Sequence, residues 1–385
     1  MNLGYPVPIV LRLVHPQFRD AVGEATTKLR VDFEAAAAVA TRPPTPARWP
    51  RLETLRVWSF NLAALEALGA ETWAGLRTLK LGVLNWPTAL DAHSTRALAA
   101  ALRRMPVLRT LELVLVEVSD ASAEALFSAS SAKAMPQLRS LTVSLARLST
   151  AAARAVAATG WRLEALDLGY NRGLGAEGLA ALLAAPAFAV RRLGLVACGL
   201  DAGAPAAIAD APWPLEELDL TDNDLGGAAA GRALVALSRL KRLRRLSVNE
   251  CNLSAAAFKA LVEAAWPALA SLDACVARVE FAGPHALGAA AFAGFPALEE
   301  LNLQEVKLGE AGARLLASRR WARLRKLLLE NTRLGDAGLA ALARGAWPAL
   351  NRLDVSGNDL GAPPTLAAAR RWAPVLTQLQ VEEDY

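Results

Sequence analysis

The sequence predicts an α/β solenoid of about 12–13 repeats, with a parallel β-sheet on the concave side and helices on the convex side. Three features predict this fold class: a recurring aliphatic pattern, a polar position at a fixed distance from it, and an Ala/Leu-rich segment that follows. The pattern L-x-x-L-x-L, in which L is any aliphatic residue, has a mean period of 27 residues. It starts at Leu52, Leu76, Leu108, Leu138, Leu163, Val190, Leu215, Leu243, Leu269, Leu298, Leu324, Leu350 and Leu376. Such a period indicates one supersecondary unit that is repeated along the chain.

Each start of the pattern predicts one short strand. In "LRKLLLENT", residues 324–332, the first, fourth and sixth residues should face the interior, because side chains alternate along a strand. One strand and one helix cannot bury their apolar faces alone. Consecutive units must therefore stack, with their strands side by side and parallel.

A small polar residue recurs eight residues after the start of many repeats. This slot holds Asn171, Cys198, Asn223, Cys251, Thr332 and Asn358, among others. A small polar side chain can hydrogen-bond the backbone where the chain leaves a strand. We therefore expect these side chains to hold the strand-to-helix turns in place.

The segment after the slot carries the family resemblance. It contains "LGxxGxxAL", as in "RLGDAGLAALARGAWPA" at residues 333–349. The spacing resembles that of a leucine-rich repeat, and this helical half is similar to the ribonuclease-inhibitor-like subclass, over about residues 50–385. The resemblance implies a horseshoe that binds proteins on its concave face. The paired glycines, Gly335 and Gly338 here, suit a tight turn into the helix.

Gly173, Gly175 and Gly178 form the text G-x-G-x-x-G of a dinucleotide-binding loop. Related text recurs without the first glycine, as "KLGEAG" at residues 307–312. A dinucleotide fold also requires an acidic residue about 20 positions further on. The next strand, "LGLVAC" at residues 193–198, contains none. We therefore expect Gly175 and Gly178 to belong to the repeat turn, and Gly173 to complete the dinucleotide-binding pattern by chance.

Seven of the ten tryptophans predict a core spine. They lie two or three residues before a strand start: Trp49, Trp73, Trp161, Trp213, Trp266, Trp321 and Trp347. Other large apolar residues take this position elsewhere, namely Met105, Met135, Phe188 and Phe295. Trp58 instead falls six residues after Leu52, on the predicted concave side. It is either an anchor for a partner or an incidental exposed aromatic residue.

The cysteines and histidines predict neither catalysis nor a metal site nor a cofactor. Cys198 and Cys251 occupy the polar slot and are expected to be structural, whereas Cys275 falls on the concave face. The three histidines, His15, His93 and His285, do not stand at zinc-like spacing from any cysteine.

The predicted concave face is acidic, although the chain carries a formal net charge of +5. At four, six and seven residues after the starts from Leu163 to Leu350, the sequence has no Lys or Arg. The acids there are Asp167, Asp219, Asp222, Glu250, Asp273, Glu305, Glu330 and Asp354. Basic residues gather one and two residues after the starts, as in "RLKRLRR" at residues 239–245. Two interpretations stand: the family tolerates Asp at this edge of the sheet, or the face attracts a basic protein segment by electrostatic steering.

The N-terminal part predicts a separate segment, with a helical cap over residues 1–48 and the repeat array over residues 49–385. The text "LRLVHPQFRDAV", residues 11–22, resembles the back half of an F-box. The adaptor-binding opening of an F-box is missing. The chain is thus either a truncated F-box leucine-rich-repeat protein or one with a simple N-terminal cap.

Together these features predict a non-catalytic scaffold that binds a protein partner, with no nucleic acid, membrane or cofactor. One alternative is a substrate-recognition subunit of a cullin-type ubiquitin ligase, which would bind an adaptor subunit. Another is a regulator of an enzyme, either an inhibitor or a GTPase activator. Three cysteines suit a reducing compartment, so we expect a cytoplasmic protein, with nuclear, cytoskeletal or ciliary association left open. The fold alone names no partner.

Overall fold

A computed structural model of the chain divides into two compact units, unit 1 over Met1–Val190 and unit 2 over Arg191–Tyr385. The structure describes residues 27–32, 46–47, 49–58, 60–83, 88–275, 287–361 and 378–380.

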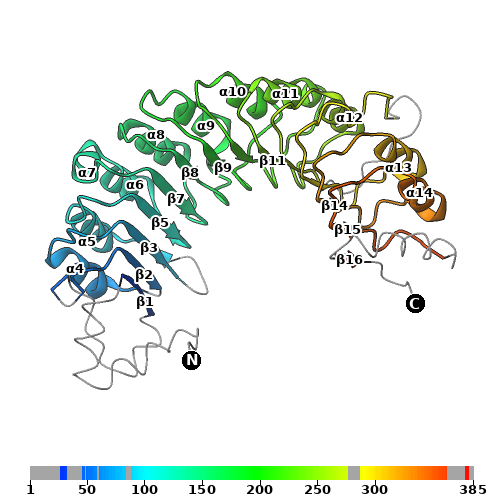
Figure 1. Cartoon of the computed structure of the whole chain (residues 1–385). Coiled ribbons are helices and arrows are strands. Elements are labelled where there is room, and N and C mark those ends of the chain that lie inside the picture. The colour runs from blue at the N-terminus through cyan, green and yellow to red at the C-terminus, as the bar shows by residue number, and fades with distance from the viewer. Residues whose placement is uncertain are drawn as a thin grey trace, which may run out of the picture. The chain divides into compact units, whose positions relative to one another are not determined.

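Unit 1 alternates strands and helices, and Figure 1 shows its helices on one side of a sheet. The sheet has the order β1-β2-β3-β5-β7-β8, with parallel neighbours, and β4 pairs with β6. The elements are β1 (Lys28–Asp32), β2 (Thr54–Trp58), α4 (Leu62–Ala70), β3 (Thr78–Gly82), β4 (Thr88–Ala89), α5 (Ala92–Leu102), β5 (Thr110–Val114), β6 (Val116–Glu117), α6 (Asp120–Leu126), α7 (Ala129–Ala134), β7 (Ser140–Ser144), α8 (Thr150–Ala158), β8 (Ala165–Asp167) and α9 (Gly175–Leu183).

Unit 2 has the same plan, with helices on one side of a parallel sheet (Figure 1). Its strands follow the chain order from β9 to β16. The elements are β9 (Arg192–Gly194), α10 (Ala204–Asp210), β10 (Glu217–Asp219), α11 (Ala230–Ala236), η1 (Leu237–Arg239), β11 (Arg245–Ser247), α12 (Ala255–Glu263), β12 (Ser271–Asp273), β13 (Glu300–Asn302), α13 (Gly309–Ala317), β14 (Lys326–Leu328), α14 (Gly335–Leu342), β15 (Arg352–Asp354) and β16 (Gln378–Gln380).

The register of the strands confirms the predicted repeats. Each of the thirteen predicted strands begins two residues after its expected start. Leu218 pairs with Leu246, and Leu246 pairs with Leu272, in adjoining parallel strands. The three side chains are at most 2% exposed. Equivalent leucines therefore stack in one continuous core within unit 2, as the solenoid requires.

The sheet of unit 1 extends to residues before the predicted array. β1 pairs with β2 in parallel, with Leu29 opposite Leu55 and Val31 opposite Val57. Most of residues 1–48 lie outside the described part of the chain, so the helical cap stays a prediction.

The predicted aromatic spine is confirmed in the core. Trp73, Trp266 and Trp321 are at most 3% exposed, and Trp347 is half-buried. In all four, the indole Nε1 donates a hydrogen bond to the carbonyl five residues earlier, at 2.8–3.0 Å. The ring thus packs where the chain passes from the helix to the next strand, and its N–H supplies a hydrogen bond to a carbonyl that has no partner within the helix.

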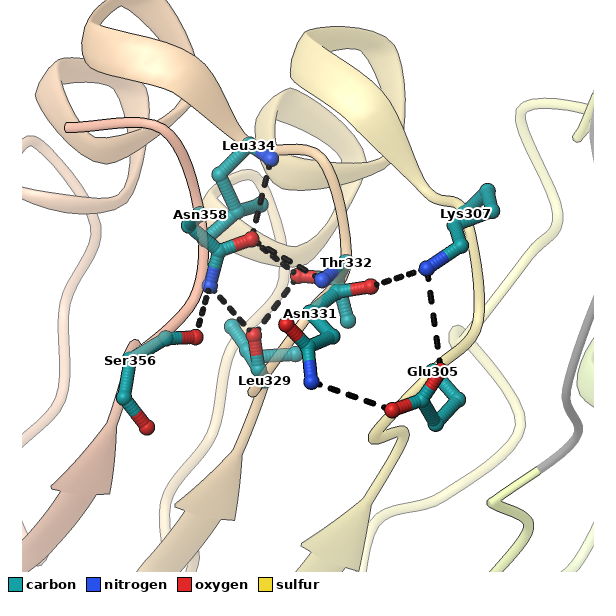
Figure 2. A network of polar contacts seen from close by, with 8 residues as sticks. All are labelled: Glu305, Lys307, Leu329, Asn331, Thr332, Leu334, Ser356 and Asn358. Atoms are coloured by element: carbon teal, nitrogen blue, oxygen red, sulfur yellow. Dashed lines mark hydrogen bonds and ion pairs between the residues drawn. The ribbon is translucent and has the colours of Figure 1, made fainter. Parts of the chain in front are cut away.

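Where the polar slot holds an asparagine, it ties its repeat to the one before it. In repeat 350–358, the Asn358 Oδ1 accepts hydrogen bonds from the backbone N–H groups of Thr332 and Leu334, at 2.9 and 3.1 Å (Figure 2). Its Nδ2 donates to the carbonyl of Leu329 at 2.6 Å and to that of Ser356 at 3.1 Å. Asn171 and Asn223 repeat this pattern. The predicted role of the slot is therefore confirmed, and the bonds cross from one repeat to the next.

The repeat glycines have the predicted role. Gly175 and Gly335 begin α9 and α14 with φ of +59° and +57°, the left-handed region in which glycine carries no steric penalty. Gly173 is more than a chance match, because a Cβ on it would lie 3.0 Å from the Leu148 carbonyl oxygen. The G-x-G-x-x-G text therefore belongs to the packing of the repeat.

Candidate functional site

The open face of the sheet, which is the side away from the helices, is the candidate site in each unit (Figure 1). Side chains alternate along a strand, so a residue two positions before one on this face also lies on it. The first residue of every strand in unit 2 therefore shares the open face with the predicted acids. From β9 to β15 these residues are Arg192, Glu217, Arg245, Ser271, Glu300, Lys326 and Arg352.

This arrangement corrects the predicted charge distribution. The sequence analysis placed the basic residues near the strand starts apart from the acidic face, because it took only later positions as outward. In the structure, Arg245 reaches across to Glu217 on the neighbouring strand, with 2.7 Å between Nη1 and Oε1. The open face of unit 2 thus has mixed charge at the strand starts and acids at the strand ends.

Some of the predicted acids hold the backbone. The Asp167 Oδ1 accepts a hydrogen bond from the Gly169 N–H at 3.0 Å, and the Asp219 Oδ1 accepts from the Thr221 N–H at the same distance. Asp354 accepts from both the N–H and the hydroxyl of Ser356 and is only 6% exposed. These contacts favour the structural interpretation of Asp in "L-D-L". Asp354 is buried and so is not part of an accessible surface.

Asp273 is half-buried at the end of β12. The Asn302 Nδ2 on the next strand donates a hydrogen bond to its Oδ1 at 2.7 Å. Burial raises the pKa of Asp273 above its usual value, and hydrogen bonds from Asn249 and Asn302 offset part of this shift.

Three further acids project from the turns that follow the strands. Asp222, Glu250 and Glu305 have φ of +56°, +49° and +66°. Leu115 and Leu145 in unit 1 share this left-handed conformation at the same repeat position. The backbone strain thus belongs to the repeat as a whole and does not mark a particular site.

Polar side chains of neighbouring repeats contact two of the acids. The Glu305 carboxylate accepts from the Asn331 Nδ2 at 3.0 Å and lies 3.8 Å from the Lys307 ammonium (Figure 2). The Glu330 carboxylate accepts from the Gln304 Nε2 at 2.5 Å. We call Asp219, Asp222, Glu250, Asp273, Glu305 and Glu330 the acidic band. Its members come from five consecutive repeats of unit 2.

The predicted aromatic anchor lies flat on the sheet. Trp58, at the end of β2, is half-buried, and a Cβ at Gly82 of the next strand would overlap its ring. Packing against that bare backbone accounts for part of its burial. Tyr170, which the sequence analysis left unmentioned, is 54% exposed. The repeat frame could have identified it, because it stands seven residues after Leu163, where Leu115 and Leu145 stand in their repeats.

The thiols of Cys198 and Cys251 donate hydrogen bonds to backbone carbonyls, as their predicted structural role requires. Cys251 is buried, and its thiol donates to the Leu220 carbonyl at 3.1 Å. Burial, the largest cause, raises the pKa of Cys251 to about 12. Burial and then the negative charge of Asp273 and its acidic neighbours raise the pKa of Cys275 to about 11. Both thiols are therefore protonated at neutral pH and poor nucleophiles.

Several predictions fall on residues outside the described part of the chain. These include the F-box-like text, His15, His285 and the acids at residues 382–384. Within the described residues, no group of three or more His, Cys, Asp or Glu side chains is placed to hold a metal ion. Searching the same residues gives no helix with the length and apolar character of a membrane span.

Comparison with known proteins identifies the type of repeat. A family model described as "Leucine Rich repeat" matches residues 163–183 and 214–230. The matched repeat, together with the parallel sheet of stacked repeats, gives the fold of a leucine-rich-repeat solenoid. No curated protein sequence matches the chain significantly.

Solved structures of other repeat proteins are similar to this chain. The TLR13 chain of a TLR13–ssRNA13 complex has a TM-score of 0.50 and 20% identity, over 81% of this chain. The chain spans only 43% of that protein. An internalin, InlF of Listeria monocytogenes, has a TM-score of 0.46 and 17% identity, over 95% of this chain and 89% of its own. A chain of the yeast Rad7–Elc1 complex has a TM-score of 0.43 and 15% identity, over 96% and 91%. At 20% identity, the likeness to the TLR13 chain concerns the fold alone.

Proposed function

We propose that this chain is a non-catalytic scaffold that binds a basic segment of a partner protein on the acidic band of unit 2. The observation that carries this proposal is the presence of acids at the strand ends of five consecutive repeats. Among the described residues, neither Glu250 nor Glu330 has an ion-pair partner, and Glu305 has one lysine 3.8 Å away. The negative charge of the band is thus only partly neutralised.

The spacing of the repeats suits an extended partner. Neighbouring strands lie about 4.8 Å apart, so five strands place acids over about 20 Å. Lysine or arginine side chains on one face of an extended segment recur every ~6.7 Å. Several such cations can therefore approach different acids at once, and the summed potential of the band accelerates their encounter.

Glu250 and Glu305 are the best positions for a test. Asp219 holds a backbone N–H, so its reversal would disturb the turn itself. Glu250 and Glu305 project from the turns and cap no backbone group of their own repeat. A matched control is Glu66→Lys with Glu124→Lys, at exposed positions of helices α4 and α6 in unit 1, which makes the same charge change away from the open face.

The experiment is a titration of a labelled lysine-rich peptide with wild-type protein and both double variants, followed by fluorescence anisotropy. We expect Glu250→Lys with Glu305→Lys to weaken binding at least about tenfold, and the control variant to change it less than about threefold. Raising the salt from about 0.05 to 0.5 M should weaken the wild-type complex, because exposed charges are screened. Equal loss in both variants, or binding that ignores salt, would contradict the proposal.

The remaining alternatives stay predictions. The ubiquitin-ligase role depends on the F-box-like text at residues 11–22, which lies outside the described residues. The enzyme-regulator role has no distinguishing residue of its own. Affinity purification with wild type and the Glu250/Glu305 variant, at low and high salt, would separate partners that use the acidic band from those that do not.

A further inference from the structure

A second charged region of unit 2 lies where the chain runs from η1 into β11. Its sequence is "RLKRLRR", residues 239–245. The structure shows a surface pocket of about 260 Å³ at this point. The pocket is lined by Glu216, Lys241, Arg242, Arg244 and Ala268. These residues come from two adjoining repeats, which start at Leu215 and Leu243, so the pocket is a product of their stacking.

The walls of the pocket are fixed by the backbone. The Arg244 N–H donates to the Glu216 carbonyl at 2.8 Å. The Arg244 carbonyl accepts from the N–H groups of Ala270 and Ser271, at 2.8 and 2.9 Å. The chain at Arg244 is thus held between the preceding and the following repeat. Its side chain extends from a rigid base.

The acids near this pocket are bound to other arginines. Glu216 pairs with Arg191 at 2.5 Å, and Glu217 pairs with Arg245 at 2.7 Å. Asp210, at the end of α10, pairs with Arg239 at 2.8 Å. None of the three basic residues that line the pocket takes part in these ion pairs.

In the described part of the chain, Lys241, Arg242 and Arg244 have no ion-pair partner, and each is exposed. Among the described residues, the charged groups of these three side chains make one polar contact, in which the Lys241 Nζ donates to the Ser238 carbonyl at 3.3 Å. Three like charges around one pocket repel one another, and a bound anion would relieve this repulsion.

The size and chemistry of the pocket indicate the ligand. Pockets for drug-sized ligands are about 300–1,000 Å³, so this one fits a single small group. Guanidinium groups donate in a planar fork that matches the oxygens of a phosphate, and a lysine adds a compact charge. We propose that Lys241, Arg242 and Arg244 form a site for a phosphoryl group, carried by a phosphorylated peptide segment or by a small free phosphate. This site shares no residue with the acidic band, so either proposal can fail without the other.

The test uses the full chain and three probes. These are inorganic phosphate, a short capped peptide that contains phosphoserine, and the same peptide with serine, each measured by isothermal titration calorimetry. We expect the phosphorylated peptide to bind and the serine peptide not to bind. Tighter binding of the phosphopeptide than of phosphate assigns the source to a phosphorylated segment, whereas equal affinity assigns it to free phosphate.

Variants show whether the pocket itself is responsible. Arg242→Glu with Arg244→Glu should weaken phosphopeptide binding at least about tenfold, because each lost charge-assisted hydrogen bond is worth about that factor. Arg242→Lys with Arg244→Lys keeps the charge but loses the fork, so it should fall between this variant and wild type. Arg323→Glu is the control, because Arg323 is exposed and directly precedes a repeat start, as Arg242 does. It should leave binding within about twofold of wild type.

Two results would overturn the proposal. In the first, the Arg242/Arg244 reversal binds phosphate and phosphopeptide as wild type does. In the second, Arg323→Glu weakens binding as much as the reversal, which would show a general effect of net charge. Circular dichroism of each variant verifies that the fold is intact.

Discussion

Most helices of unit 1 begin differently from most helices of unit 2, although α9 of unit 1 has no side-chain cap and begins at Gly175 with positive φ. From α4 to α8, a side chain caps the first turn, and the capping residues are Asn61, Asp91, Ser119, Ser128 and Ser149. In unit 2, α10, α11, α13 and α14 have no side-chain cap, and Ser254 caps α12. Helices α13 and α14 instead begin at a glycine with positive φ. The same repeat therefore has two ways to enter its helix, one that satisfies backbone N–H groups and one that uses backbone freedom.

The polar slot differs in the same direction. In unit 1, Val116 and Ala146 fill the slot and are fully buried, and only its last repeat has an asparagine, Asn171. In unit 2, the buried slots include Asn223 and Asn358. An apolar slot contributes packing alone, whereas an asparagine replaces water for several backbone groups at once. The two units should therefore respond differently when the slot is emptied.

The largest expected effect comes from Asn223→Ala in unit 2. Asn223 accepts hydrogen bonds from the N–H groups of Cys198 and Leu200, and its Nδ2 donates to buried carbonyls including that of Leu195. Unsatisfied buried groups cost about 1–3 kcal/mol each, so we expect a loss of about 3–4 kcal/mol in the free energy of unfolding. Urea denaturation would measure it.

Val116→Ala in unit 1 is the matched change, since it empties an apolar slot. It removes two buried methyl groups' worth of packing, and we expect a loss of about 1–2 kcal/mol. If both variants lost the same free energy of unfolding, polar and apolar slots would contribute equally to stability, which would contradict the contrast between the units.

The next effect separates the two ways of starting a helix. Gly335 has φ of +57° and no atom within 4 Å of an added Cβ, so Gly335→Ala adds only backbone strain, about 1–2 kcal/mol. Gly361 also has open space around it but no positive φ, so Gly361→Ala should change stability by less than about 0.5 kcal/mol. In unit 1, Ser119→Ala should cost about 1 kcal/mol through loss of a cap. A Gly335→Ala variant as stable as wild type would show that α14 does not need its glycine.

The smallest effects are pH dependences of opposite sign in the two units. The Ser94 N–H and the hydrogen bonds around it lower the pKa of Asp91 below 3.8, so its contribution to stability is present above pH 3.8 and is lost as the pH falls through the folded value. Burial raises the pKa of Asp273 above 3.8, so its penalty is present at neutral pH and disappears as the pH falls toward 3.8. On acidification, wild type should therefore lose stability relative to Asp91→Asn and gain it relative to Asp273→Asn, in urea midpoints measured across about pH 3–7. Slopes of the same sign would contradict this contrast.

The repeat frame was predictable from the sequence because it depends on aliphatic residues at fixed spacing. Leu218, Leu246 and Leu272 needed no knowledge of their partners to be placed in one core. Charges were harder to place, because their partners lie one repeat away. The Arg191–Glu216 pair joins residues 25 apart, and no local pattern distinguishes it from two solvated side chains.

The candidate site was therefore predicted only in part. The outward direction of Asp219 followed from strand alternation, but its hydrogen bond to the Thr221 N–H depends on the turn that follows the strand. Likewise, the position of Trp58 was clear, but its contact with Gly82 depends on the register between β2 and β3. Faces follow from periodicity, whereas contacts follow from the neighbouring repeat.

The asparagine contacts also set an order of events when the chain is made. Asn223 completes hydrogen bonds for backbone groups about 25 residues upstream, at Cys198 and Leu200. A ribosome releases the N-terminal part of a chain first, so those groups emerge before their partner does. The backbone groups of such a repeat therefore stay hydrogen-bonded to water until the asparagine of the following repeat leaves the exit tunnel. In a nascent chain of this protein, a repeat closed by such an asparagine thus completes its hydrogen bonds only after the next repeat has been synthesised.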